Sequence, residues 1–163
     1  MQKLSSKAEE KTNVMRLLEQ KNIPYKHYSY VGTQAVSGVE VAEALNQDAA
    51  RVFKTLVTVS KSRKNYVFMI PVAEELDLKK AAKAVGEKSI EMVKSKELLA
   101  LTGYIHGGCS PIGMKKYFET VIDCTALNYE TIIFSGGKIG YQVEMSMDSL
   151  KQVIPFKTAP VTV

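Results

Sequence analysis

The segment GGCSPIG at residues 107–113 places a cysteine in a glycine-rich loop, with His106 immediately before it. A thiolate in such a loop is a nucleophile when backbone N–H groups stabilise it and a base takes its proton. Cys109 is flanked by small residues, however, and a cysteine there is equally a small apolar group that fills a half-buried position. We favour this second interpretation, and we expect Cys124, at the end of the apolar segment FETVIDC, in the core.

Lys54 interrupts the apolar segment VFKTLV. Strict alternation along a strand would place it on the same face as Val52 and Leu56, where burial of an ammonium group is costly. Periodicity alone supports two interpretations of Lys54 equally well. The lysine either protects an edge strand from aggregation, or it lines a concave site and meets an anionic group of a ligand.

Two glycine turns complete the group of residues that could do chemistry: GGCSPIG at residues 107–113 and SGGK at residues 135–138. Paired glycines let the backbone approach a ligand closely and let successive N–H groups point at one anion or oxyanion. SGGK alone is also an ordinary hairpin turn. Together with Lys54, the two turns indicate a pocket.

Most other reaction classes find no support in the sequence. His27 and His106 are isolated, and no spacing typical of a zinc site is present, so we expect no metal and no cofactor. Glu74 and Glu75 are adjacent and would point apart, which disfavours a glycosidase-type carboxylate pair. The GxSxG elbow, the P-loop and the GxGxxG fingerprint are missing as well.

The chain has 163 residues, of which 45% are apolar and 24% charged, as in an ordinary globular protein. We expect a flexible segment at residues 1–11 and a single domain at residues 12–163. We expect a soluble cytoplasmic protein with no membrane partner. The chain has only two cysteines, its N-terminus is polar, and its apolar runs are too short to cross a bilayer.

The net charge of +5 slightly favours an anionic partner. Lys79, Lys80, Lys83 and Lys88 follow one another closely, and the sequence leaves open whether they form a solvated face or contact phosphates.

Helical spacing and capping residues predict five helices, and apolar or alternating runs predict eight strands. The expected helices are residues 12–21, 38–46, 78–86, 95–101 and 146–154. Thr12 or Asn13 is the expected N-cap of the first, Asp77 and Gly86 bound the third, and Ser95 is the expected N-cap of the fourth. The expected strands are 25–30, 52–59, 66–71, 89–93, 102–107, 118–124, 131–135 and 138–145. Because strands often follow strands, the pattern predicts an α+β fold with a mixed sheet.

The segments VFKTLV, IPVAEELDLKKAAKAVGEKSIEMV, TGYIHGGCSPIGMKK and IIFSGGKIGYQVEM, in this order, resemble the YbaK/EbsC family of single-domain aminoacyl-tRNA deacylases. This family is related to the editing domain of bacterial prolyl-tRNA synthetase. The resemblance runs from about Thr12 to the final helix. It implies a mixed, partly barrel-like β-sheet flanked by short helices, and hydrolysis of the ester that joins a wrong amino acid to tRNA.

The resemblance also implies a substrate and partners. The GGCSPIG form is similar to the branch that clears cysteine from prolyl-tRNA, so the predicted reaction is trans-editing of Cys-tRNA(Pro). Expected partners are the aminoacylated 3′ end of tRNA and prolyl-tRNA synthetase. In this family the thiol of the tRNA-bound cysteine attacks its own ester carbonyl, so the protein needs no nucleophile of its own.

Site residues follow from the same resemblance. The expected catalytic residues are Lys54, Gly107 and Gly108. Lys54 is expected to meet the phosphate or ribose of the terminal adenosine, and the backbone of Gly107 and Gly108 to lie against the aminoacyl carbonyl. The residues expected to bind substrate are Tyr30, Ser37, Ser110, Pro111, Gly113, Ser135, Gly136, Gly137 and Gln142. Ser37 and Gln142 depart from the family pattern, which often has an aromatic and an acidic residue there, and this could alter the preference for cysteine.

Three alternatives stay open at the level of sequence. The protein could clear alanine or serine instead of cysteine, or it could be a non-catalytic module that binds tRNA or a synthetase. It could also be a hydrolase of small thioesters that uses Cys109.

Overall fold

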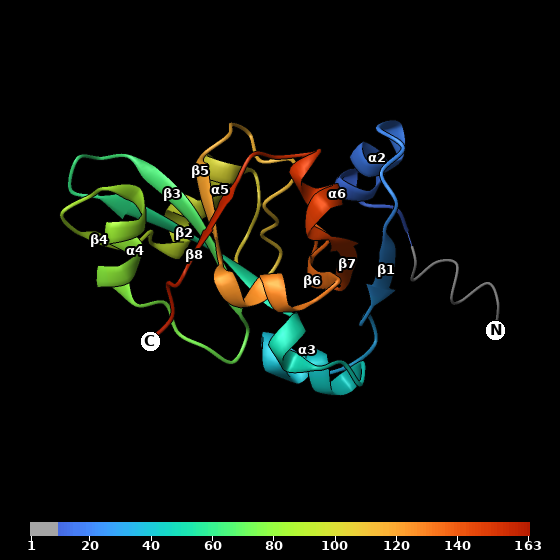
Figure 1. Ribbon diagram of the computed structural model, residues 1–163. Helices are drawn as coiled ribbons and strands as arrows, with labels where there is room; N and C mark the ends of the chain where they lie inside the picture. The colour runs from blue at the N-terminus through green and yellow to red at the C-terminus, as the bar shows by residue number, and fades with distance from the viewer. Residues whose placement is uncertain (1–9) are drawn as a thin grey trace, which may run out of the picture.

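The computed structural model describes residues 10–163 (Figure 1), so residues 1–9 of the segment expected to be flexible lie outside the described residues. Its strands form two sheets with the orders β1-β7-β6 and β4-β2-β3-β5-β8. The bounds are β1 Lys26–Ser29, β2 Phe53–Ser60, β3 Asn65–Pro71, β4 Ile90–Met92, β5 Glu119–Asp123, β6 Thr131–Ser135, β7 Tyr141–Ser146 and β8 Lys157–Ala159.

Among residues 10–163, five α-helices cover these sheets: α2 Asn13–Gln20, α3 Gly38–Ala44, α4 Leu78–Val85, α5 Ser95–Thr102 and α6 Met147–Lys151. Two 3-10 turns, η1 Ala49–Arg51 and η2 Cys124–Asn128, precede β2 and follow β5. Helices α2 and α6 lie beside the three-stranded sheet, while α4 lies at the opposite end beside β4 (Figure 1).

The strand directions are mixed, which confirms the predicted α+β class. Within the five-stranded sheet β2 pairs antiparallel with β3 and β4, whereas β3–β5 and β5–β8 are parallel. A single parallel bridge between Val52 and Ile133 links this sheet to the three-stranded one. The two sheets are thus joined at one corner without closing into a full barrel, which agrees with the partly barrel-like arrangement that was expected.

Strand β3 forms the centre of the core and is buried on both faces. Phe68 and Ile70 pack toward Ala81 and Ala82 of α4, whereas Met69 faces the cluster under α2 and α6. A strand covered on both sides reads as a continuous apolar run, which is why YVFMIP was recognisable from the sequence.

Local capping explains where the helices begin and end. Thr12 accepts a hydrogen bond from the Met15 N–H and starts α2. Asp77 accepts from two backbone N–H groups at the start of α4, and Gly86, with φ 72°, ends that helix in the left-handed conformation that glycine adopts readily. Both helix starts were predicted.

Three expectations about local structure were wrong. TGYIHG is not a strand, because α5 continues to Thr102, Gly103 ends it with φ 86°, and a loop follows. Helix α5 is preceded by Lys94 as N-cap, not by Ser95. Strand β8 was missed because it has only three residues and lies beside β5 without a periodic pattern of its own.

Glu144 of β7 ties several elements together. Its carboxylate is buried, accepts hydrogen bonds from the hydroxyls of Tyr28 and Thr131, and pairs with Arg51 of η1, the Nη2–Oε2 distance being 2.9 Å. Burial raises the pKa of Glu144, but the hydrogen bonds from Thr131 and Tyr28 and the charge of Arg51 outweigh this, so the pKa is lowered overall. The carboxylate thus joins β1, β6 and β7 to the turn that leads into β2.

We predict that Glu144→Gln lowers the free energy of unfolding by about 2–3 kcal/mol, because it leaves Arg51 without its buried partner. Because the folded pKa is lowered, this stabilisation is complete above the unfolded pKa of about 4.3 and is lost as the pH falls through the folded value. Urea unfolding at several pH values measures both effects. Exposed Glu130→Gln is the control, and equal stability of the two variants would contradict the prediction.

Candidate functional site

One edge of β2 changes its partner along its length. Val52 bridges to β6, residues 58–60 pair with β4, and the Val57 carbonyl accepts from the Val93 N–H. Among the described residues no strand pairs with this edge between these points, at residues 53–56. A cavity of about 570 Å³ opens there, and we call it the β2 cavity.

The walls of the β2 cavity come from segments far apart in the sequence. They are the region from Tyr30 to the start of α3, the adjoining ends of β6 and β7, the segment from β4 into α5, and the loop at residues 106–109. The structure brings six predicted residues onto these walls: Tyr30, Ser37, Lys54, Gly107, Ser135 and Gln142. The other six, which lie outside the walls, are Gly108, Ser110, Pro111, Gly113, Gly136 and Gly137.

Lys54 is half-buried at the open edge of β2. It forms no ion pair with any carboxylate of the described residues. It pairs across the strands with Ile70 and shares a face of β2 with Leu56, so its side chain lies on the face that α4 covers. A half-buried ammonium without a carboxylate partner is free to pair with an anionic ligand group.

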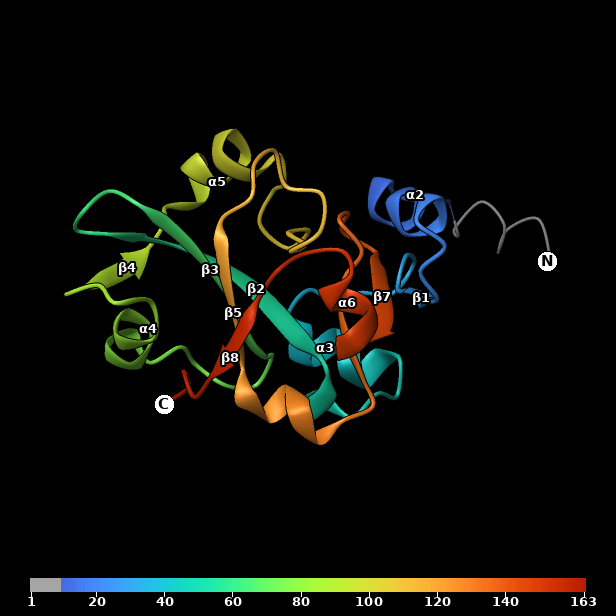
Figure 2. The ribbon, with the colours of Figure 1, turned by 45° about the horizontal axis from the view of Figure 1, so that its top comes forward.

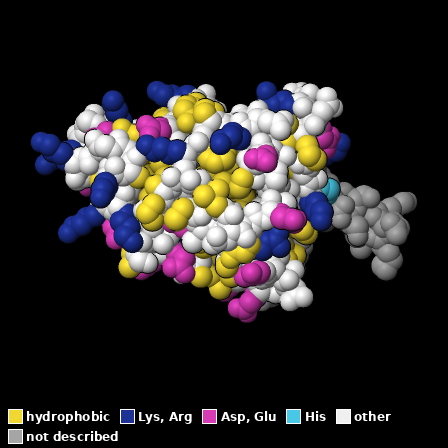
Figure 3. Space-filling model, viewed as in Figure 1, with side chains coloured by type: hydrophobic (Ala, Val, Ile, Leu, Met, Phe, Trp, Pro, Cys, Tyr) yellow, Lys and Arg dark blue, Asp and Glu magenta, His cyan; other side chains and the backbone are white. Residues whose placement is uncertain are grey.

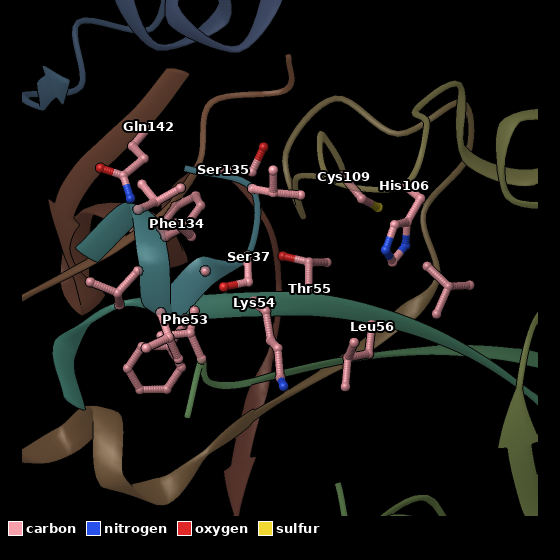
Figure 4. A pocket seen from close by; sticks show the side chains of 18 of the residues that line it. Ser37, Phe53, Lys54, Thr55, Leu56, His106, Cys109, Phe134, Ser135 and Gln142 are labelled. Atoms are coloured by element: carbon pink, nitrogen blue, oxygen red, sulfur yellow. The ribbon is translucent and has the colours of Figure 1, made fainter. Parts of the chain in front are cut away.

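Thr55 points to the other side of β2 and was not singled out from the sequence. Figure 4 shows its side chain on the side where Ser37, Cys109 and His106 lie, opposite to Lys54. Its Oγ1 is buried and has no hydrogen-bond partner among the described residues. An unpaired buried hydroxyl costs about 1–3 kcal/mol, so this atom is a polar point in the cavity wall that a bound water or a ligand would satisfy. The only signal in the sequence was a second polar residue beside Lys54 in an apolar strand.

The loop at residues 106–109 offers one backbone donor instead of the expected two. Gly108 N–H donates to the Ile105 carbonyl at 3.0 Å, so it is engaged within the loop. Gly107 N–H has no acceptor among the described residues, and its φ of 89° is in the left-handed region. A Cβ on Gly108 would lie 3.1 Å from the backbone nitrogen of Ile139. Gly108 therefore allows this loop to pack against the 135–140 turn.

Several glycines of the two turns act in packing around Tyr104. A Cβ at Gly113 would lie 2.8 Å from the Tyr104 hydroxyl, and one at Gly137 would lie 2.8 Å from Val14 and 3.2 Å from Tyr104. Tyr104 in turn donates a hydrogen bond to the Ile112 carbonyl. These contacts clamp the GGCSPIG loop, the SGGK turn and α2 together.

The serines of the two turns have similar roles. Ser110 is fully buried and accepts from the Ile112 N–H at 3.2 Å, while Ser135 accepts from the Gly137 N–H at 3.0 Å. Of the two, only Ser135 lines the β2 cavity, where its hydroxyl hydrogen can still be donated to a ligand.

Ser37 and Gln142 form part of the wall with their polar groups already engaged. Ser37 is the N-cap of α3 and forms a capping box with Glu40. The side-chain amide of Gln142 exchanges hydrogen bonds with that of Gln47, at 2.8 Å and 3.3 Å. The wall at Gln142 is therefore neutral and held in place.

Cys109 lines the cavity but is not an activated nucleophile. It is 8% exposed and packs with Val57, Leu98 and Phe118, which confirms its interpretation as a small apolar filler. Burial raises the pKa of its thiol to about 12, so the thiol is neutral near pH 7. Cys124, expected in the core, is half-buried in η2.

Titratable and metal-binding groups are sparse around the cavity. His106 is exposed and lies on the cavity wall (Figure 4). Across residues 10–163, no three His, Cys, Asp or Glu side chains come together as a metal site. No helix in the same range is long and apolar enough to cross a membrane.

The fold matches solved structures over almost the whole chain. A solved structure described as that of a candidate trans-editing enzyme for prolyl-tRNA synthetase superposes with a TM-score of 0.81 at 23% identity, covering 92% of this chain and 94% of the other. The protein APE2540 superposes with a TM-score of 0.84 at 20% identity, covering 93% and 100%. At these identities the likeness defines the fold alone.

Sequence comparison defines the family. The pattern of the aminoacyl-tRNA editing domain matches residues 33–153, and the chain belongs to this family. It is 46% identical over 157 residues to EbsC of Enterococcus faecalis, a protein assigned as a Cys-tRNA(Pro)/Cys-tRNA(Cys) deacylase, with 96% of each chain covered. It is also 36% identical over 102 residues to a proline–tRNA ligase of Shouchella clausii, covering 63% of this chain and 18% of the ligase. The resemblance seen in the sequence is thereby confirmed.

We predict that Cys109 reacts slowly with iodoacetamide at pH 7.5, because its thiol is buried and protonated. The half-buried Cys124 serves as the internal reference, and mass spectrometry of timed samples gives both rates. Faster labelling of Cys109 than of Cys124 would show a thiolate and would contradict the filler role.

Proposed function

We propose that this protein hydrolyses mischarged aminoacyl-tRNA in trans, with Cys-tRNA(Pro) as its substrate. Family membership and the 46% identity to EbsC support the reaction class and the substrate. The observation that carries the proposal is the pair Lys54 and Thr55, which present an unpaired ammonium and an unpaired hydroxyl on opposite sides of one open strand edge.

This pair divides the cavity between the two parts of the substrate. The phosphate or ribose of the terminal adenosine binds on the Lys54 side, where the described chain supplies no carboxylate to compete. The aminoacyl group binds on the Thr55 side, with Gly107 N–H at its carbonyl oxygen and Cys109 in the wall. The amino acid attached to the tRNA must have a small side chain, because Val57 and Phe134 already line the wall on this side.

The reaction that suits this cavity uses a nucleophile from the substrate. The sulfur of the tRNA-bound cysteine attacks its own carbonyl carbon, the C–S bond forms, and the ester bond to the ribose oxygen breaks. The thiol proton ends on that oxygen, and the cysteine leaves as a thiolactone that water then opens. Holding the thiol in near-attack geometry lowers the barrier by up to about 7–11 kcal/mol, and an oxyanion donor adds about 3–4 kcal/mol.

Selection of tRNA(Pro) is a separate part of the proposal. No base-reading element is recognisable in the sequence, so we infer that a complex with prolyl-tRNA synthetase supplies this discrimination in the cytoplasm. Comparing deacylation of Cys-tRNA(Pro) and Cys-tRNA(Cys) with and without the synthetase tests it, and discrimination by the isolated protein would contradict it.

We predict that Lys54→Ala lowers kcat/KM for Cys-tRNA(Pro) deacylation at least 100-fold, because the variant loses the only ammonium on the cavity wall among the described residues. Thr55→Val keeps the side-chain shape, removes Oγ1 and lowers kcat/KM about 10-fold. Cys109→Ala is the matched control from the same wall and retains most of the activity. Steady-state deacylation of preformed substrate measures all three, and an inactive Cys109 variant would contradict the substrate-assisted reaction.

We predict that a panel of tRNA(Pro) charged with Cys, Ser, Ala or Pro shows fast clearance of cysteine only, because serine has a hydroxyl in place of the thiol, and alanine and proline have no nucleophile on the side chain. Equal rates for Cys and Ser would mean that water attacks the ester directly. Binding of charged tRNA without any deacylation would instead favour a non-catalytic binding module.

A further inference from the structure

Lysine and arginine gather at the end of the molecule that the β2–β3 hairpin, β4 and α4 form (Figure 3). Residues 61–96 hold nine Lys and Arg against five Asp and Glu, although the whole chain has a net charge of only +5. We define the basic end by six exposed residues of the hairpin, of α4 and of the segment that follows α4: Lys61, Arg63, Lys64, Lys79, Lys83 and Lys88.

These six cations outnumber the carboxylates around them, and of the six the charge of Lys64 acts on Glu87. None forms an ion pair with a described carboxylate. The acidic side chains nearby are partly engaged elsewhere, since Asp77 caps α4 and Glu87 accepts hydrogen bonds from Tyr66 and Ser62. The positive charge therefore faces solvent over a continuous set of elements.

A hollow at the tip of the hairpin adds donors to this surface. It is lined by Val59, Ser60, Lys61, Arg63, Ser89 and Glu91. Two cations and the hydroxyl of Ser89 around one hollow match a phosphate group, with Glu91 as the single opposing charge. The Ser60 hydroxyl is engaged by Ser62 and by the Lys64 N–H.

Strand β2 connects the β2 cavity to the basic end. Figure 2 shows it running from beside α3 to the hairpin at the far end, past β4. From Lys54 to Lys61 the strand spans seven residues, or about 23 Å at a rise of about 3.3 Å per residue. Lys54 lies on the face of β2 that α4 covers, so a strand of nucleic acid leaving the cavity on this side passes toward α4.

We propose that the basic end binds the phosphates of the tRNA acceptor arm while the 3′ end occupies the β2 cavity. This inference rests on the proposed function, which places a tRNA 3′ end in that cavity. Contacts of this kind position the duplex without reading its bases, because lysine and arginine meet phosphate oxygens in any sequence. The surface thus supplies affinity for tRNA in general and no preference for tRNA(Pro).

The test uses three variants with the same change in net charge. One carries Lys61→Gln, Arg63→Gln and Lys64→Gln, and the second carries Lys79→Gln, Lys83→Gln and Lys88→Gln. The control carries Lys21→Gln, Lys26→Gln and Lys151→Gln, three exposed residues at the other end: the C-cap of α2, a residue of β1 and the last residue of α6. All substituted side chains are exposed, and thermal unfolding verifies that each variant is folded.

Binding of uncharged tRNA is measured by filter retention between 50 and 300 mM KCl. Log K falls as log[KCl] rises, and each lost phosphate contact makes this negative slope shallower by about 0.7–0.9. Each basic-end variant is therefore expected to make the slope shallower by about 2–3 and to weaken binding about 100-fold at 0.1 M KCl. The control variant keeps the wild-type slope. Equal slopes for the control and the basic-end variants would overturn the proposal.

A minimal substrate separates this proposal from the proposed function. The cysteine ester of adenosine occupies the cavity without an acceptor arm, so the basic-end variants are expected to hydrolyse it at the wild-type rate. Slower hydrolysis of this ester would mean that the six residues act on the cavity, which would contradict a docking role. The wild-type protein could hydrolyse neither Cys-tRNA(Pro) nor the cysteine ester of adenosine while its tRNA binding still depends on the basic end. That result would contradict the deacylase function and would support the docking surface.

Discussion

The interrupted edge of β2 is the constraint on which the site depends. A strand edge in a protein is normally paired or covered, because its backbone polar groups need partners. Here β6 takes that edge at Val52 and β4 takes it from Thr58 onward, and the stretch between them is left to a cavity. Alternate side chains of a strand point to opposite faces, so consecutive residues at this opening line two different sides of the cavity. Lys54 lies on one side and Thr55 on the other.

The glycine-rich turns contribute to the site mainly by bringing its walls together. Gly113 and Gly137 make room for Tyr104, and Gly108 lets the two turns meet backbone to backbone. This rigid arrangement suits a reaction in which the protein positions a reactive substrate, since small displacements of a near-attack geometry are costly in rate. It also accounts for a cysteine that faces the cavity and yet remains a neutral packing group.

Much of this architecture could be predicted from the sequence. Within the described part of the chain, capping residues and apolar runs identified all five helices and seven of the eight strands, because those signals are local. The loop after α5 was mistaken for a strand because Tyr104 and Ile105 are strand formers by type, while their conformation is set by Gly103 and by contacts with distant residues. In the site, Lys54 stood out as a charge within an apolar run. Thr55 did not, because its missing hydrogen-bond partner is a property of three-dimensional surroundings that no spacing records.

The pairing of β1 with β7 has a consequence for how the protein forms. Lys26 lies opposite Glu144, so the first described strand has no partner until most of the chain is available. The parallel pair of β3 and β5 likewise joins residues near 66 to residues near 119. Contacts so distant in sequence make folding slow, because loop closure must precede any gain from pairing. During synthesis the cavity can therefore assemble only after β7 has left the ribosome, and no shorter nascent chain would possess the site.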